Sequence, residues 1–157
     1  MKKLIVIRGP LGIGKTTIAK KLASDLKAEC VSIDEILKDY GLEKDRDYVA
    51  EDFIKANEII IPKLKTILKK NNIIVEGNFY FQEVLEHLLK NTTGNHRVFT
   101  LKAPLEICLA RDKQREKSLG PLATEAIYSL VNRFDYGIPI DGRNRIGKIV
   151  EEIINNL

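Results

Sequence analysis

Tryptophan is absent from this sequence of 157 residues, and cysteine and histidine occur only twice each. Cys30 and Cys108 lie in apolar segments without the spacing of metal ligands, so we expect two buried, reduced thiols. His87 and His96 are isolated in the sequence, which argues against a histidine metal centre. No apolar run approaches the ~20 residues that a membrane span needs. These absences favour a cytoplasmic protein without membrane attachment.

The excess of positive charge is also small. A formal net charge of +4 suits a protein that handles phosphorylated ligands, but it is too small to indicate nucleic-acid binding by itself. Repeats, low-complexity tracts and linkers are absent as well. This length is typical of one globular unit that buries about 70% of its unfolded surface. We therefore expect a single domain over residues 1–157.

The strongest motif lies near the N-terminus. An apolar run over residues 4–7 leads into Gly-Pro-Leu-Gly-Ile-Gly-Lys-Thr at 9–16, and a helical pattern follows. The spacing Gly-x-x-x-x-Gly-Lys-Thr between a strand and a helix defines a P-loop. Glycines let successive backbone N–H groups point at one phosphate, and the N-terminus of the helix adds further unpaired N–H groups. The motif therefore predicts nucleoside triphosphate binding.

Two side chains of this motif have specific roles in such chemistry. Lys15 reaches the β- and γ-phosphates, and the hydroxyl of Thr16 holds Mg²⁺. ATP and Mg²⁺ are therefore the cofactors that we predict. The loop residues expected to bind the nucleotide are Gly9, Pro10, Leu11, Gly12, Ile13, Gly14, Lys15, Thr16 and Thr17.

Strands and helices alternate along the rest of the chain. Short apolar or β-branched runs predict strands near 3–8, 30–33, 73–75, 97–101 and 138–140. Helical patterns between them cover about 15–26, 50–70, 81–90 and 144–156, with further helices opening near 104 and 124. We expect Pro62 to kink or split the second of these helices and Thr124 to cap a later one. The alternation predicts an α/β fold with a parallel sheet and ligands at the carboxyl ends of its strands.

Three carboxylates follow predicted strands at that edge of the sheet. Asp34 is a candidate for accepting the proton of an attacking hydroxyl or for ligating Mg²⁺, with a helix N-cap as the alternative. Glu76 is a candidate for anchoring Mg²⁺ or its waters, for binding substrate, or for capping its strand. Asp141 is better explained as a cap or turn residue.

A basic segment covers residues 111–117 and runs on to Gly120-Pro121. Arg111 and Arg115 are one helical turn apart, so we expect them to project on the same side and to stabilise charge on a transferring phosphoryl group. The Gly-Pro pair would end this helix and permit a mobile flap. The alternative is a solvated charged face with surface ion pairs.

On these motifs the sequence resembles the P-loop kinases of the nucleoside-monophosphate-kinase fold group, over essentially its whole length. The resemblance rests on the P-loop, on Asp34, on Arg-x-x-x-Arg at 111–115 and on Ile-Asp-Gly-Arg-Asn at 140–144. It implies a three-layer P-loop fold with a five-stranded parallel sheet in the order 2-3-1-4-5 and a short lid over about 111–121. It also implies that the lid arginines contact phosphates and that Arg143 and Asn144 lie against adenine.

Within that group, Val-Ser-Ile-Asp-Glu at 31–35 is more similar to kinases that phosphorylate an alcohol, such as chloramphenicol phosphotransferase and the zeta-toxin, polynucleotide, gluconate and shikimate kinases. In these families an aspartate after strand two positions or deprotonates the acceptor hydroxyl, and the resemblance implies that role for Asp34. Two departures from the family patterns bear on the acceptor: the first counts against a nucleoside monophosphate, and the second counts against shikimate. Adenylate-kinase-like enzymes carry an arginine shortly after strand two, whereas the first one here is Arg46. Shikimate kinases carry a glycine cluster after strand three, whereas only Gly77 stands here.

The resulting hypothesis is an ATP-dependent kinase of a hydroxyl-bearing small molecule, acting as a monomer or homodimer. Its expected catalytic residues are Lys15, Asp34, Arg111 and Arg115, and its expected metal ligands are Thr16, Asp34 and Glu76. An acceptor-binding region is expected over about 35–60, and Phe53, Tyr80 and Phe81 are candidates either for its walls or for the core. Three alternatives stay open: a nucleoside monophosphate acceptor, a polynucleotide 5′-hydroxyl acceptor, and an ATP-binding regulatory module without transfer activity.

Overall fold

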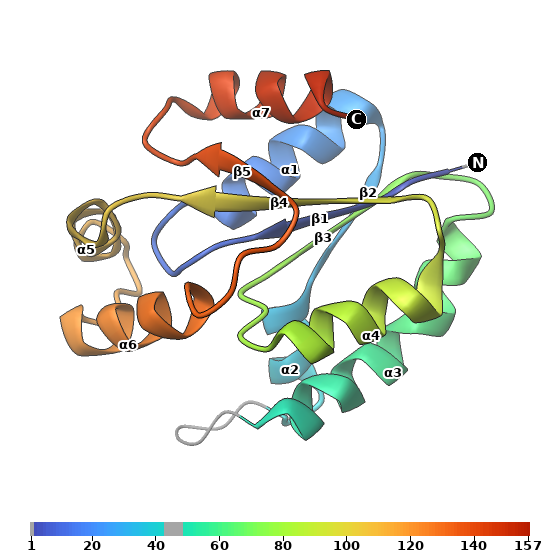
Figure 1. Ribbon diagram of the computed structural model, residues 1–157, viewed down its shortest axis with the longest axis horizontal. Coiled ribbons are helices and arrows are strands. Elements are labelled where there is room, and N and C mark those ends of the chain that lie inside the picture. The colour runs from blue at the N-terminus through green and yellow to red at the C-terminus, as the bar shows by residue number, and fades with distance from the viewer. Residues whose placement is uncertain (1, 43–48) are drawn as a thin grey trace.

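A parallel sheet with helices on both faces forms the centre of the molecule (Figure 1). The computed structural model describes residues 2–42 and 49–157. The strands of the sheet are β1 (Leu4–Arg8), β2 (Glu29–Ser32), β3 (Ile73–Gly77), β4 (His96–Lys102) and β5 (Ile138–Asp141). Their order is β2-β3-β1-β4-β5 and every pairing is parallel, which confirms the predicted fold class and strand order.

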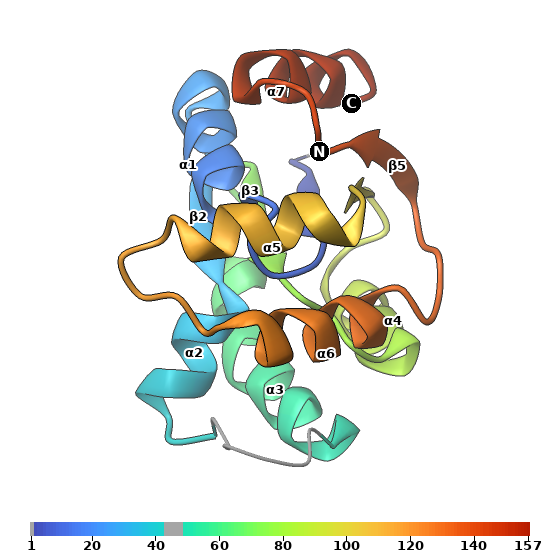
Figure 2. The same ribbon diagram turned by 90° about the vertical axis from the view of Figure 1, so that its left-hand side faces the viewer.

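Helices cover both faces of this sheet and its carboxyl edge. They are α1 (Lys15–Leu26), α2 (Ile33–Asp39), α3 (Ala50–Ile67), α4 (Gln82–Thr92), α5 (Leu105–Lys113), α6 (Pro121–Val131) and α7 (Ile146–Asn155). In Figure 1, α1 and α7 lie on one face, and α3 and α4 lie on the other. Figure 2 shows α5 and α6 in front of the edge at which the strands end. No helix among the described residues is long and apolar enough to cross a membrane.

The central strand explains why the sheet needs helices on both sides. Every residue of β1 is buried, because β3 and β4 flank it and helices cover its two faces. Leu4 and Val6 belong to the core beneath α3 and α4, whereas Ile5 and Ile7 belong to the core beneath α1 and α7. Successive side chains of a strand point to opposite faces, so a strand of this kind is a continuous apolar run.

The register of the sheet determines where polar side chains gather. Arg8, the last residue of β1, lies level with Gly77 of β3 and Thr100 of β4. The P-loop that follows β1 and the turn that follows β3 therefore leave the sheet side by side. This is the edge at which ligands bind in parallel α/β sheets.

Several local expectations are wrong. Pro62 does not split α3, which runs as one helix from Ala50 to Ile67 with the proline inside it. Thr124 is not an N-cap, because α6 begins at Pro121 and the Thr124 hydroxyl donates to the carbonyl of Gly120 within the first turn. Gly120-Pro121 therefore opens α6 rather than closing α5. Proline is favoured at the first helical position because its missing N–H would have no partner there.

The two cysteines differ in their surroundings. Cys108 is fully buried on the side of α5 that packs against the P-loop, as expected. Cys30 is exposed, contrary to expectation, because β2 lies at the edge of the sheet. Phe53 and Tyr80 belong to the core, with 5% of each side chain exposed, and Phe81 packs partly buried against them.

Candidate active site

The P-loop connects the end of β1 to the start of α1. Gly12 and Gly14 have φ angles of 82° and 99°, which side chains other than glycine rarely adopt. A Cβ atom on Gly12 would also lie 2.6 Å from the carbonyl oxygen of Cys108. The loop therefore packs closely on α5, and α1 begins at Lys15 with its N-terminal N–H groups facing the inside of the loop.

Lys15 crosses the interior of this loop. Its Nζ donates to the carbonyl oxygen of Pro10 at 2.9 Å, and only 7% of the residue is exposed. Burial lowers the pKa of Lys15; the carboxylates of Asp34 and Glu76 oppose that shift, and the charge of Arg115 adds to it. A partly desolvated ammonium group held in this way interacts strongly with an incoming anion.

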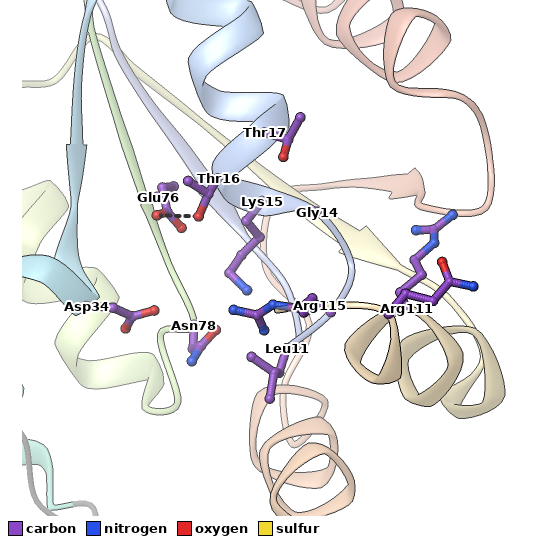
Figure 3. A pocket seen from close by; sticks show the side chains of 12 residues that line it. Leu11, Gly14, Lys15, Thr16, Thr17, Asp34, Glu76, Asn78, Arg111 and Arg115 are labelled. Atoms are coloured by element: carbon purple, nitrogen blue, oxygen red, sulfur yellow. Dashed lines mark hydrogen bonds between the residues drawn. The ribbon is translucent and has the colours of Figure 1, made fainter. Parts of the chain in front are cut away.

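Thr16 and Glu76 join α1 to β3. The Thr16 hydroxyl donates to Oε1 of Glu76 at 3.1 Å (Figure 3). Glu76 is 2% exposed, and its second oxygen, Oε2, has no hydrogen-bond partner in the described part of the chain. A buried carboxylate oxygen without a donor, next to a hydroxyl, fits a divalent cation or its bound water.

A pocket of about 340 Å³ collects most of the predicted site residues, and we call it the phosphate pocket. Its lining comprises Leu11, Gly12, Gly14, Lys15, Thr16, Thr17, Asp34, Glu76, Asn78, Arg111, Gln114 and Arg115. In Figure 3, Lys15 points from the start of α1 into the middle of this pocket, with Asp34 on one side and Arg115 on the other. Of the remaining loop residues, Pro10 accepts the hydrogen bond from Lys15, and Gly9 packs behind the loop against Leu101.

Asp34 lies in the first turn of α2, two residues beyond the end of β2. It is not the N-cap, because Ser32 caps α2 by accepting the N–H of Glu35. The Asp34 carboxylate faces the phosphate pocket from the side opposite Arg115 (Figure 3). The capping alternative for Asp34 is therefore wrong, and its carboxylate lies at the same pocket as Lys15.

The two lid arginines do not share a helix face, contrary to expectation, because α5 ends at Lys113. Arg111, in the last turn of α5, donates to the carbonyl oxygens of Gly142 at 2.8 Å and Ile13 at 3.2 Å. Arg115 lies beyond the helix, and its guanidinium points toward Lys15 (Figure 3). Arg111 thus fixes the P-loop against the loop after β5 and also lines the phosphate pocket, while Arg115 is the arginine whose guanidinium points toward Lys15.

The lid loop, residues 114–120, folds around the buried carboxylate of Asp112, which is 2% exposed. Asp112 accepts hydrogen bonds from the Ser118 hydroxyl at 2.7 Å and from the N–H of Gly120 at 3.1 Å. It also pairs with Arg115 at 3.4 Å. Burial by itself would raise the pKa of Asp112, but the hydrogen bonds from Ser118, Leu119, Gly120 and Thr124 outweigh it and hold the pKa below its usual value. In this conformation the lid loop forms a defined turn around Asp112.

A second pocket, of about 320 Å³, lies on the other side of Arg111. Arg143 and Asn144 line it together with Ile13 and Gly14 of the P-loop. Asp141 orients the loop by accepting from the backbone N–H of Arg143 at 3.0 Å and from its guanidinium, and the hydrogen bonds from Arg143 lower the pKa of Asp141 to about 2. Asp141 is thus a turn residue, as expected.

Three further polar residues at this edge of the sheet were not among the predicted site residues. Asn78 and Gln114 line the phosphate pocket, and Arg8 is fully buried behind the P-loop. Asn78 comes directly after β3, as Asp34 comes shortly after β2. The expectation that carboxylates after a strand lie at the ligand-binding edge would have identified Asn78 if it had been extended to amides. The signal for Arg8 was a charged residue at the end of an otherwise apolar strand.

Comparisons with known proteins identify a family and several relatives of this chain. A family model described as "AAA domain" matches residues 4–135. A shikimate kinase from Caldicellulosiruptor bescii is 30% identical over 114 residues, which cover 71% of this chain and 64% of that relative. A cytidylate kinase from Saccharolobus islandicus is 30% identical over 151 residues, which cover 88% of this chain and 76% of that relative. The chain thus spans less than two thirds of the first relative and about three quarters of the second.

Solved structures resemble the whole chain. A sugar kinase from Janibacter sp. HTCC2649 superposes with a TM-score of 0.84 at 17% identity, covering 99% of this chain and 94% of that one. A gluconokinase from Sinorhizobium meliloti 1021 gives a TM-score of 0.76 at 13% identity, covering 98% and 90% of the two chains. At such identities the likeness concerns the fold, and it agrees with the predicted resemblance to P-loop kinases.

Proposed function

The chain belongs to the family described as AAA domain, and on that premise we propose that it is a kinase that transfers the γ-phosphoryl group of ATP to a hydroxyl group of a small molecule. Its relatives and structural neighbours with known names include shikimate, cytidylate, sugar and gluconate kinases. The proposal goes beyond that likeness because it assigns a reaction to particular residues of this chain.

One observation carries the proposal: Asp34 and Lys15 line the same phosphate pocket. The carboxylate lies across the pocket from Arg115 in Figure 3, with the lysine between them. A phosphoryl group between the three residues would have cations on two sides and a proton acceptor on the third.

The residues of the pocket divide the chemistry between them. Asp34 accepts the proton of the acceptor hydroxyl, or holds that hydroxyl in line, while Lys15 and Arg115 stabilise the charge on the oxygens of the transferring group. Arg111 holds the P-loop in place through Ile13 and lines the second pocket, where Arg143 and Asn144 would contact adenine. Because Arg115 is anchored to Asp112, its guanidinium is positioned before any ligand arrives.

The site suits Mg²⁺ and ATP. Thr16 and Glu76 would hold the cation between them, with Asp34 on the same pocket, because Mg²⁺ binds through one or two carboxylates, hydroxyls and phosphates. The unpartnered Oε2 of Glu76 supports this assignment. When bound, Mg²⁺ neutralises negative charge on the phosphates.

A nucleoside monophosphate acceptor is the second candidate, favoured by the cytidylate kinase relatives. Such an acceptor needs a cation for its own phosphate, and Arg46 is the first arginine after strand two. Arg46 lies outside the described residues, as does part of the predicted acceptor region over 35–60. Competition between nucleoside monophosphates and neutral alcohols for the same enzyme separates the two candidates.

The test is release of ADP from Mg²⁺-ATP in the presence of pooled acceptors: sugars, sugar acids, amino alcohols, nucleosides, nucleoside monophosphates and 5′-hydroxyl oligonucleotides. We expect one pool of alcohols to stimulate release, and Lys15→Met to lower the stimulated rate by at least about a hundredfold. Lys20→Met, an exposed lysine of the same helix, is the matched control and should retain the rate. ATP binding without stimulation by any pool would contradict the proposal and favour a regulatory module.

A further inference from the structure

The turn that follows β3 has a strained backbone at a bulky residue. Phe79 has a φ of 50° and is 3% exposed, although left-handed conformations are common only for glycine, asparagine and aspartate. Such a conformation is energetically unfavourable and persists only where the surroundings enforce it. Strained residues of this kind cluster at functional sites, so the turn over residues 77–80 merits a functional explanation.

Contacts on several sides hold this turn in place. Nη2 of the buried Arg8 donates to the carbonyl oxygen of Phe79 at 3.4 Å. A Cβ atom on Gly77 would lie 3.1 Å from Cβ of Ile33, so the backbone approaches the start of α2 closely. The ring of Tyr80 packs edge-on against Phe53 at a centroid distance of 5.4 Å. These contacts leave the intervening Asn78 little freedom.

The amide of Asn78 is oriented by its neighbour. Its Nδ2 donates to the hydroxyl of Tyr80 at 2.7 Å, and the residue is 6% exposed. In Figure 3 the Asn78 oxygen points toward Lys15 and Arg115, and the amide nitrogen points away from them. This oxygen, Oδ1, has no hydrogen-bond partner among the described residues. A buried carbonyl oxygen without a donor is unfavourable, and a ligand that donates a hydrogen bond to it would remove that penalty.

The side of the phosphate pocket at which the alcohol substrate would bind therefore presents oxygens that can accept hydrogen bonds. Asp34 and Asn78 line the same pocket, and each directs an oxygen into it, whereas the cations Lys15 and Arg115 face the place of the phosphoryl group. A molecule that donates a hydrogen bond to each of these two oxygens carries two donor groups. Its reacting hydroxyl would donate to Asp34, and a second donor would reach Asn78.

We propose that Asn78 determines acceptor specificity: its Oδ1 accepts a hydrogen bond from a hydroxyl or amino group next to the hydroxyl that is phosphorylated. The substrate class is then a polyol, sugar or amino alcohol rather than an alcohol with one functional group. This inference rests on the proposed function, because it assumes that Asp34 receives the reacting hydroxyl.

The test compares acceptors that differ in one donor group. The probes are D-glucose, D-ribose, D-gluconate and D-glucosamine, each beside its monodeoxy analogues, with 1-butanol as an acceptor that has a single hydroxyl. We expect the wild type to prefer a parent compound over the analogue that lacks the adjacent donor by about tenfold to a hundredfold in kcat/KM. Asn78→Ala should reduce that preference to within about threefold, because it removes the oxygen that reads the donor.

Two further variants test orientation and charge. Tyr80→Phe removes the hydroxyl that fixes the amide, so the preference should fall without loss of Oδ1 itself. Asn78→Asp keeps an accepting oxygen and adds charge, so it should retain the preference and shift it toward D-glucosamine if the second donor is an amine. Asn57→Ala is the matched control, since Asn57 is a fully buried asparagine in α3 that also has an unpartnered Oδ1 but lies away from the pocket.

The outcomes separate this inference from the proposed function. Phosphorylation of a polyol with a preference that Asn78→Ala leaves unchanged would overturn the role of Asn78 and leave the kinase assignment intact. Turnover of 1-butanol as fast as that of every polyol would also overturn it. The same loss of preference in Asn57→Ala would show a general effect of destabilisation, which refutes a specific role. A wild type that binds ATP but releases no ADP with any probe or pool would overturn the proposed function and this inference together.

Discussion

Replacing Arg8 with methionine is expected to lower the free energy of unfolding by about 2 kcal/mol. Arg8 is fully buried at the end of β1, and its guanidinium donates to the carbonyl oxygens of Val131 at 2.7 Å and of Phe79 at 3.4 Å. It also donates to the Thr100 hydroxyl at 3.2 Å and lies 4.2 Å from the centre of the Phe134 ring. One side chain thereby links the P-loop strand, β4, the turn after β3 and the C-terminal end of α6.

Two opposing effects determine the size of this change. Methionine leaves the two buried carbonyl oxygens of Val131 and Phe79 without donors, at about 1–3 kcal/mol each, and removes a contact with Phe134 of about 1 kcal/mol. Methionine also removes a buried charge, whose desolvation lowers the pKa of Arg8 from 12.5 to about 10. At about 1.4 kcal/mol for each pKa unit, that relief amounts to about 3 kcal/mol. The unpaired carbonyl oxygens and the lost contact with Phe134 together outweigh the relief, which leaves a net loss of about 2 kcal/mol.

The measurement is urea-induced unfolding, supported by thermal unfolding, in which a loss of this size lowers the Tm by about 4–8 °C for a domain of this length. Lys21→Met is the control, because Lys21 is half-exposed and forms a surface ion pair with Asp25 one turn away, so we expect a change of less than about 0.5 kcal/mol. An Arg8→Met protein as stable as the wild type, or more stable, would refute the reasoning. It would show that desolvation of the guanidinium costs more than its hydrogen bonds contribute.

Two further predictions concern the site itself. Asp34→Asn should lower acceptor-dependent ADP release by about 10²–10⁴-fold while ATP binding, measured by calorimetry, stays within about threefold, because an amide cannot take up the proton of the acceptor; unchanged turnover would remove the role of proton acceptor from Asp34. Asp112→Asn should destabilise the protein at neutral pH, because the hydrogen bonds to Ser118 and Gly120 favour the ionised carboxyl. The folded-state pKa of Asp112 is lowered, so its contribution to stability is fully present above its unfolded pKa of about 3.9 and is lost as the pH falls through the folded pKa. Urea unfolding at pH 7 and pH 3 should therefore show a smaller difference between wild type and Asp112→Asn at the lower pH, and an equal difference at both would count against this account.

The sequence was informative wherever the determining pattern is local. The P-loop is a run of adjacent residues with fixed spacing, and the apolar runs of β1 and β3 are typical of strands buried on both faces. The carboxyl ends of parallel strands meet at one edge, which is why Asp34 and Glu76 could be assigned to the same site before any contact was known. The order of the strands came from the resemblance to P-loop kinases.

Local patterns were misleading where helix boundaries depend on distant contacts. Arg-x-x-x-Arg indicated one helix face, but α5 ends at Lys113 because the carboxylate of Asp112 draws the following backbone into a turn. Pro62 was expected to disturb α3, yet the helix continues because residues on both sides of it, such as Ile60 and Leu64, are buried in the core. Tertiary packing outweighed the local preference at both places.

The sequence by itself determined the nucleotide-binding loop, the alternation of strands and helices, and the edge of the sheet at which the site lies, because each of these depends on neighbours in the chain or on a repeating period. Only the tertiary structure decided that Arg115 rather than Arg111 faces Lys15, that Asn78 directs an unpaired oxygen into the same pocket, and that Arg8 joins β1 to α6. Those outcomes depend on hydrogen bonds between residues as far apart in the chain as Arg8 and Val131, and on where buried polar atoms find partners. Packing of the whole chain, rather than any sequence pattern, determines which partners those are.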